Sequence, residues 1–292
     1  MPVPARPRRS VLYMPGSNPR ALEKGRSLAA DGLILDLEDA VAPDTKATAR
    51  AQIAAAIGEG GYGRRELIVR TNGLDSAWGA EDLKAAATMG ADAVLLPKVE
   101  SADMVMAAIA ALDAAGGPSD LPIWCMMETP LGMLRAEKIA FASPRVGGFV
   151  MGTSDLAKDL RAAHTPDRIP FITSLGLCVL AARAAGIAIL DGVHLDLGDD
   201  AGFETACKQG LELGFDGKTL IHPKTIAKAN EVFSPTNDEI EWSKRIILAH
   251  AEAEQQGQGV VVVEGRLIEN LHVESAKRLV VLAEAIAEMN TE

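Results

Sequence analysis

Short apolar runs alternate with amphipathic, alanine-rich stretches from about residue 9 to residue 221. The runs are rich in Val, Ile and Leu and predict buried parallel strands. They span residues 9–14, 33–37, 66–71, 92–97, 122–128, 146–152, 188–194 and 216–221. Eight strands with helical segments between them predict a (β/α)8 TIM barrel rather than an open doubly wound sheet. The first strand is not followed by a G-x-G-x-x-G motif, which also disfavours a dinucleotide-binding sheet.

The pattern changes after residue 233. The segment SPTNDEIEWSKRIILAHAEAEQQG predicts a helix with Asn237 or Asp238 near its cap, and GVVVVEGRLIENLHV predicts a hairpin that turns at Glu264-Gly265. ESAKRLVVLAEAIAEM then predicts a terminal amphipathic helix. We therefore expect a barrel at residues 1–233 and a helix–hairpin–helix segment at residues 234–292. A segment this small should pack on the barrel or on a neighbouring subunit.

Polar residues follow the predicted strands at their C-terminal ends. In a closed barrel these ends share one rim, where side chains distant in sequence meet at one site. The residues are Asp36, Glu38, Asp39, Arg70, Lys98, Glu128, Asp155 and His222.

Glu128 and Asp155 follow the fifth and sixth strands and are the candidate metal ligands. Two carboxylates on adjacent strand ends suit Mg²⁺, which keeps several waters and binds substrate oxygens. Pro130 should start the next helix and so fix where Glu128 points. The alternatives are that Asp155 caps a helix and that Glu128 forms a salt bridge at the rim.

Three basic residues are candidates for binding the anionic groups of a substrate. Arg70 could bind a substrate carboxylate through its fork of donors, or pair with Asp36 or Glu38, or do both. Arg20 and Lys24 share one helical face, where they could contact phosphate or be ordinary solvated charges.

Composition excludes several classes of partner. The net charge of −11 disfavours binding to nucleic acid or anionic membranes, and an aromatic content of 4% argues against base stacking. No apolar run is long enough to span a membrane. The three cysteines suggest small buried side chains in a reducing cytoplasm rather than a disulfide framework.

Taken together, several motifs in order give the chain a close resemblance to the citrate lyase β-subunit-like family of the HpcH/HpaI aldolase superfamily, which includes malyl-CoA and citramalyl-CoA lyases. The matching stretches extend from about residue 8 to residue 227. They are RRSVLYMPGSNPRALEK, LILDLEDAVAPDTKATAR, VRTNG, LLPKVES, METPLGM, GTSDLAKDL and GFDGKTLIHPKTI.

This resemblance implies a TIM barrel with a C-terminal lid, assembled as a homo-oligomer (a trimer or hexamer). It implies Mg²⁺ at Glu128 and Asp155, with Arg70 binding the substrate carboxylate. The implied coenzyme A contacts are Tyr13, Arg20 and Lys24. The implied pocket lining is Asp36, Glu38, Asp39 and the backbones of Ile221 and His222.

The tail hairpin departs from the family pattern. Members that act on coenzyme A esters carry a run like DGKMIDMPH, whose aspartate reaches a neighbouring site as the acid/base. The matching run here is EGRLIENLH, which places Glu269 at that position. The carboxylate is kept on a stem longer by one methylene, and a small change in reach can alter rate.

The resemblance therefore implies a Mg²⁺-dependent carbon–carbon lyase acting on a short 3-hydroxyacyl-CoA of the malyl or citramalyl type. The products would be acetyl-CoA with glyoxylate or pyruvate. The alternatives are a malyl-CoA thioesterase on the same scaffold, a citrate lyase β subunit, and a non-catalytic protein that binds coenzyme A esters.

Overall fold

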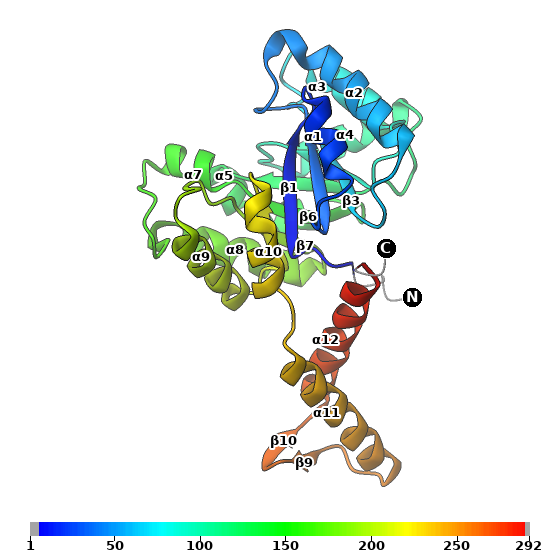
Figure 1. The fold of residues 1–292 in the computed structure, drawn as a ribbon, viewed down its shortest axis with the longest axis vertical. Coiled ribbons are helices and arrows are strands. Elements are labelled where there is room, and N and C mark those ends of the chain that lie inside the picture. The colour runs from blue at the N-terminus through cyan, green and yellow to red at the C-terminus, as the bar shows by residue number, and fades with distance from the viewer. Residues whose placement is uncertain (1–5, 290–292) are drawn as a thin grey trace. The chain divides into compact units, whose positions relative to one another are not determined.

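Eight parallel strands close into a barrel in the computed structural model, which describes residues 6–289 (Figure 1). Each strand pairs with its neighbour in sequence, and β1 pairs with β8 to close the ring, with Ser10 opposite Lys218. This confirms the predicted TIM barrel. The strands are β1 (Ser10–Pro15), β2 (Gly32–Asp36), β3 (Glu66–Arg70), β4 (Ala93–Leu96), β5 (Ile123–Met127), β6 (Val146–Met151), β7 (Ala188–Asp191) and β8 (Gly217–Leu220).

Helices follow the strands along the chain and form the outer layer of the barrel. They are α1 (Pro19–Gly25), α2 (Lys46–Glu59), α3 (Gly79–Ala86), α4 (Ala102–Ala114), α5 (Pro130–Leu134), α6 (Ala136–Ala140), α7 (Thr153–Leu160), α8 (Ile169–Ala185), α9 (Asp200–Leu213) and α10 (Ile226–Val232). Single 3₁₀ turns precede α2 and α10, at η1 (Pro43–Thr45) and η2 (Pro223–Thr225).

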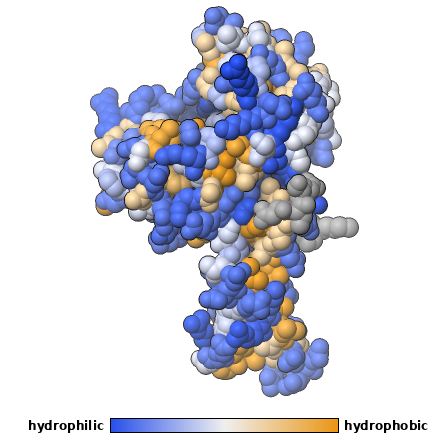
Figure 2. Space-filling model, viewed as in Figure 1, coloured by the Kyte–Doolittle hydropathy of each residue, from blue (hydrophilic) through white to orange (hydrophobic). Residues whose placement is uncertain are grey.

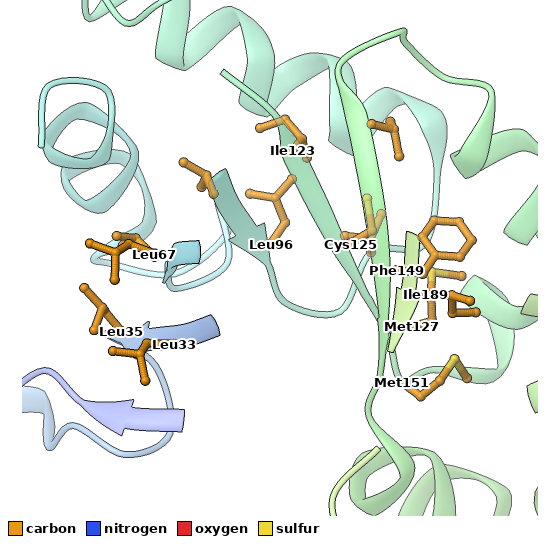
Figure 3. Close-up of a cluster of buried hydrophobic side chains, with 14 of the residues drawn as sticks. Leu33, Leu35, Leu67, Leu96, Ile123, Cys125, Met127, Phe149, Met151 and Ile189 are labelled. Carbon is orange, nitrogen blue, oxygen red and sulfur yellow. The ribbon is translucent and has the colours of Figure 1, made fainter. Parts of the chain in front are cut away.

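The two faces of the strands bury two separate apolar clusters. Leu33, Leu35 and their counterparts on other strands pack against the helices, as Figure 3 shows. Ile34 and Ile68 instead belong to the cluster that fills the barrel. Because strand side chains alternate with a period of two, Asp36 continues the inner row of Ile34 at the rim. The inward-facing positions of a strand are therefore apolar within the barrel and become polar at its C-terminal end, where the site lies.

The predicted strand ends lie within one residue of the observed ends for seven of the eight strands. The exception is the run at residues 188–194, because β7 ends at Asp191. The buried carboxylate of Asp191 accepts hydrogen bonds from Arg168 and Lys218, at 2.5 and 2.7 Å. It also accepts one from the backbone N–H of Gly192, at 2.8 Å. The chain turns away there, so residues 192–194 form a rim loop despite their strand-like composition.

A second compact unit is formed by the chain from Ser234 onward together with Arg6 and Pro7, and it contains two helices and a hairpin. The helix α11 (Asn237–Gln255) is capped by Thr236 in a capping box with Glu239, so the predicted cap at Asn237 or Asp238 was wrong by one or two residues. The strands β9 (Val261–Val263) and β10 (Arg266–Ile268) turn at Glu264 and Gly265, whose φ angles of 48° and 78° suit a tight hairpin. This confirms the predicted turn.

The last helix, α12 (Asn270–Met289), begins four residues before its predicted start. The unit has a small core of its own, made of Ile246, Val263, Ile268, Val273 and Ala276. Figure 2 shows apolar patches on the visible surface of this unit. That it acts as a lid remains a prediction. Across residues 6–289, none of the helices combines the length and apolar character that a membrane crossing needs.

Candidate active site

Arg70 and Asp36 form a buried ion pair at the ends of two neighbouring strands. The residues are register partners in β3 and β2. Nε and Nη2 of Arg70 donate to the two carboxylate oxygens of Asp36, at 2.7 and 2.6 Å. Nη1 lies 2.7 Å from Oε2 of Glu38 and 3.6 Å from a carboxylate oxygen of Asp39. The predicted ion pairing is thus confirmed.

The guanidinium of Arg70 also lies over the ring of Tyr13, with its carbon 4.9 Å from the ring centre. Burial opposes ionisation of Arg70, but the hydrogen bonds and charge of Asp36 outweigh it and raise the pKa of the guanidinium. Burial also raises the pKa of the Tyr13 phenol. Arg70 is therefore a fixed cation held in place on two sides.

The loop after β2 is held by Lys46, the first residue of α2. Its buried ammonium donates to the carbonyl oxygens of Leu37 and Glu38, each at 2.7 Å, and to Oδ1 of Asn72 at 2.9 Å. The Asp36 carboxylate in turn accepts the backbone N–H of Glu38 at 2.9 Å. These bonds fix the direction of the acidic side chains around Arg70.

Glu128 is the first residue after β5 and is almost fully buried. Thr129 caps α5 through a hydrogen bond to the N–H of Gly132, and Pro130 opens the helix as predicted. Oε1 of Glu128 accepts the backbone N–H of Lys98 at 2.7 Å. Burial, with the nearby charge of Glu38, raises the pKa of Glu128 to about 7.

Gly152 leaves the space beside the second oxygen of Glu128 open. A Cβ atom at residue 152 would lie 2.4 Å from both Cβ and Oε2 of Glu128. Any side chain there would have to displace the carboxylate. Glu128 is also without an ion-pair partner among residues 6–289, so the alternative of a rim salt bridge was wrong.

Asp155 lies in the first turn of α7, behind Gly152 at the N-cap. It does not cap the helix, so that alternative was also wrong. Its carboxylate is about one quarter exposed and lies 3.0 Å from Nζ of Lys158 and 3.9 Å from Nζ of Lys98. Asp155 is therefore partly open to solvent, whereas Glu128 is buried.

A cavity of about 330 Å³ brings most of the predicted residues together. Its lining includes Tyr13, Asp36, Asp39, Arg70, Glu128, Gly152, Asp155 and Ile221. Four carboxylates line this cavity, of which Asp36 is paired with Arg70, and the described residues form no cluster of three or more metal-binding side chains. Glu128 and Asp155 are the two that were predicted to bind a metal. Two hard oxygen donors suit Mg²⁺. A divalent ion would also compensate the charge of Glu128, which burial otherwise disfavours. The donor set therefore fits the implied metal.

Glu38, His222 and Glu269 are among the predicted residues that lie outside this lining. The carboxylate of Glu38 contacts Arg70 from the side, and the exposed His222 accepts the N–H of Lys224 through Nδ1 at 3.1 Å, which caps η2. Glu269 lies in the second unit, directly after β10, and its backbone carbonyl accepts the N–H of His272. Its catalytic role remains a prediction.

The expected coenzyme A residues fall in two places. Tyr13 lies in the cavity, whereas Arg20 and Lys24 are exposed on α1 and line a separate hollow of about 590 Å³ beside α2. Gly16 allows the backbone after β1 to approach the end of β2, because a Cβ atom at this position would lie 2.6 Å from the carbonyl oxygen of Asp36. Two basic side chains on one helical face are suited to phosphate, and their role remains a prediction.

Residues 9–223 match the model of the HpcH/HpaI aldolase/citrate lyase family. The chain belongs to this family. A (3S)-malyl-CoA thioesterase from Cereibacter sphaeroides is 53% identical over 283 residues, which cover 97% of each chain. The citrate lyase subunit beta of Haemophilus influenzae is 38% identical and aligns with 92% of this chain and 94% of its own. The family match and these relatives, which are enzymes, confirm the predicted resemblance.

Among solved structures, the CitE protein of Mycobacterium tuberculosis in complex with magnesium, acetoacetate and coenzyme A is 28% identical, with a TM-score of 0.77. The alignment covers 97% of this chain and 100% of that one. Magnesium and coenzyme A are therefore ligands found in a protein of the same family.

Proposed function

We propose that the chain is a magnesium-dependent thioesterase that hydrolyses a short hydroxyacyl-CoA of the malyl-CoA type. The observation that carries the proposal is the meeting of Arg70, Glu128 and Asp155 at one cavity of about 330 Å³. The thioesterase from Cereibacter sphaeroides, 53% identical over nearly the full length, supports the choice of reaction.

Each residue of the site has its own role in this hydrolysis. Glu128 and Asp155 would hold Mg²⁺, which supplies Lewis-acid stabilisation of negative oxygen when bound. Arg70 binds the substrate carboxylate, and Tyr13 bounds the cavity beside it. Arg20 and Lys24 bind phosphates of coenzyme A at the hollow on α1. Water adds to the thioester carbonyl, the carbon–sulfur bond breaks, and the proton lost by water ends on the thiolate of coenzyme A.

We assign the proton transfer to Glu269, delivered by the second unit of a neighbouring subunit. This requires residues 234–292 to act as a lid on a separate domain at residues 1–233, in a homo-oligomer. Ile221 and His222 would shape the pocket through their backbones. The three buried cysteines, Cys125, Cys178 and Cys207, are consistent with a reducing cytoplasm.

The second candidate is carbon–carbon cleavage of the same substrates. The citrate lyase beta subunits among the relatives favour it, as does the acetoacetate bound with magnesium in the CitE protein. As the substrate hydroxyl loses its proton, a carbonyl would form and the adjacent carbon–carbon bond would break, leaving its electron pair on the thioester fragment as an enolate. Protonation of this enolate would release acetyl-CoA. The remaining fragment would be glyoxylate or pyruvate.

The test is a product analysis by mass spectrometry with malyl-CoA and citramalyl-CoA in the presence of Mg²⁺. Free hydroxy acid with coenzyme A is the expected result, whereas acetyl-CoA with a 2-oxo acid would establish the lyase instead. Glu128→Gln and Asp155→Asn should each abolish turnover, and Lys158→Met should not. Tight binding of both esters without turnover would leave only a coenzyme A-ester binding protein.

A further inference from the structure

Lys98 contacts the acidic side chains of the site through both its backbone and its side chain. Its backbone N–H donates to Oε1 of Glu128 at 2.7 Å. Its ammonium lies 3.2 Å from Oε1 of Glu38 and 3.9 Å from Oδ2 of Asp155. A single residue thus reaches three carboxylates that come from three different strand ends.

The backbone of Lys98 is held in an unusual conformation. Its φ angle is +48°, in the left-handed region that residues with a Cβ atom disfavour. Such conformations persist where surrounding contacts impose them, often at functional sites. Here the following N–H, of Val99, bonds the carbonyl oxygen of Met126, and the N–H of Lys98 bonds Glu128. The turn therefore aims one N–H at Oε1 and leaves Oε2 of Glu128 for another partner.

We propose that Lys98 is a positioning residue whose ammonium acts as a tethered cation: it pairs with the carboxylates of the metal-free site and competes with the divalent ion for them. The proposal rests on the metal site of the proposed function. A divalent ion shared by Glu128 and Asp155 would bring two positive charges within a few ångströms of the ammonium. Either the ammonium leaves Asp155 or the ion binds less tightly, so Lys98 lowers metal affinity in both cases.

The charge of Lys98 also has a role before the metal binds. Glu38, Glu128 and Asp155 are carboxylates that all contact Lys98, and Arg70 is already engaged by Asp36 and Glu38. The Lys98 ammonium reduces their mutual repulsion. Its removal should therefore destabilise the metal-free protein and strengthen metal binding at once, a pair of opposite effects that a purely structural lysine would not produce.

The experiment is a titration with Mn²⁺, with free Mn²⁺ measured by electron paramagnetic resonance, and a competing titration with Mg²⁺. Lys98→Met keeps the backbone N–H and the apolar stem but removes the charge. We expect it to bind Mn²⁺ about tenfold more tightly, as loss of one charge near a divalent ion at a partly solvated site predicts. In EDTA its melting temperature should fall, and the rise on adding Mn²⁺ should exceed that of the wild type.

Two variants serve as controls. Lys98→Arg keeps the charge and should keep the affinity of the wild type. Lys158→Met removes another ammonium that contacts Asp155, at 3.0 Å, but one that is two-thirds exposed and pairs with neither Glu38 nor Glu128. Solvent screening should limit its effect to less than about threefold.

Unchanged or weaker Mn²⁺ binding by Lys98→Met would overturn the inference while leaving the proposed function intact. Equal gains in Lys98→Met and Lys158→Met would also overturn it, because the effect would then be one of general surface charge. If the wild type itself binds no divalent ion, the metal site of the proposed function fails, and this inference fails with it.

Discussion

Replacing Glu128 by glutamine should stabilise the metal-free protein at alkaline pH. The buried carboxylate has its pKa raised from 4.5 to about 7, first by burial and then by the charge of Glu38. At roughly 1.4 kcal/mol for each pH unit, this difference in pKa corresponds to a full cost of about 3.5 kcal/mol. Glutamine can still accept the N–H of Lys98 but carries no charge to desolvate. The variant should therefore avoid this cost.

The sign of the pH dependence follows from which state ionises first. Below pH 4.5 Glu128 is neutral in both the folded and the unfolded chain, so it contributes no cost. Between pH 4.5 and 7 the Glu128 carboxyl is ionised in the unfolded chain but stays protonated in the folded protein, so the free energy of unfolding falls as the pH rises. Above pH 7 the cost is complete. The stability gained by Glu128→Gln should thus grow from near zero at pH 4.5 to about 3.5 kcal/mol at pH 8.

Urea denaturation in EDTA at several pH values measures this difference. Glu137→Gln, at an exposed position in α6, controls for the chemical change alone and should show no such trend. Adding Mg²⁺ should recover stability in the wild type but not in Glu128→Gln. A difference between wild type and variant that stays constant from pH 4.5 to pH 8 would refute the assignment of a desolvated carboxylate.

Two further substitutions test the geometry of the site. Arg70→Met should destabilise the protein by about 3–5 kcal/mol in urea denaturation, because Asp36 and Glu38 lose their buried cation; a loss below about 1 kcal/mol would contradict this. Gly152→Ala should cost about 1–3 kcal/mol of stability, because its Cβ overlaps Glu128. It should also weaken Mg²⁺ binding in a calorimetric titration, and unchanged binding would show that Oε2 does not face the metal.

The barrel was predictable because each strand carries its own signal in a run of branched apolar residues. The run at residues 188–194 misled the prediction, since its composition is that of a strand while the ion pairs of Asp191 end β7 early. Those partners, Arg168 and Lys218, are distant in sequence. No local pattern reveals them. The cap of α11 at Thr236 was missed because several neighbouring residues could serve as a cap.

The sequence predicted the parts of the site that are built from side chains at strand ends, but not the parts that depend on backbone atoms. The positions of Arg70 and Glu128 after their strands placed both at the rim. Lys46 was overlooked because it holds the site through carbonyl oxygens. The contribution of Lys98 depends on an N–H in a left-handed turn, and that of Gly152 on a missing side chain. A glycine directly after a strand, beside a predicted metal ligand, was the one available signal.

The ion pair of Arg70 and its proposed binding of a substrate carboxylate are compatible, because they use different edges of the guanidinium. Asp36 occupies the edge formed by Nε and Nη2. Nη1 contacts Glu38 and the sulfur of Met126, at 3.8 Å, which is a weak acceptor. A guanidinium has five N–H donors, so a carboxylate can replace the sulfur at Nη1 and use the second N–H of Nη2. The acidic residues therefore orient the arginine without consuming its capacity to bind substrate.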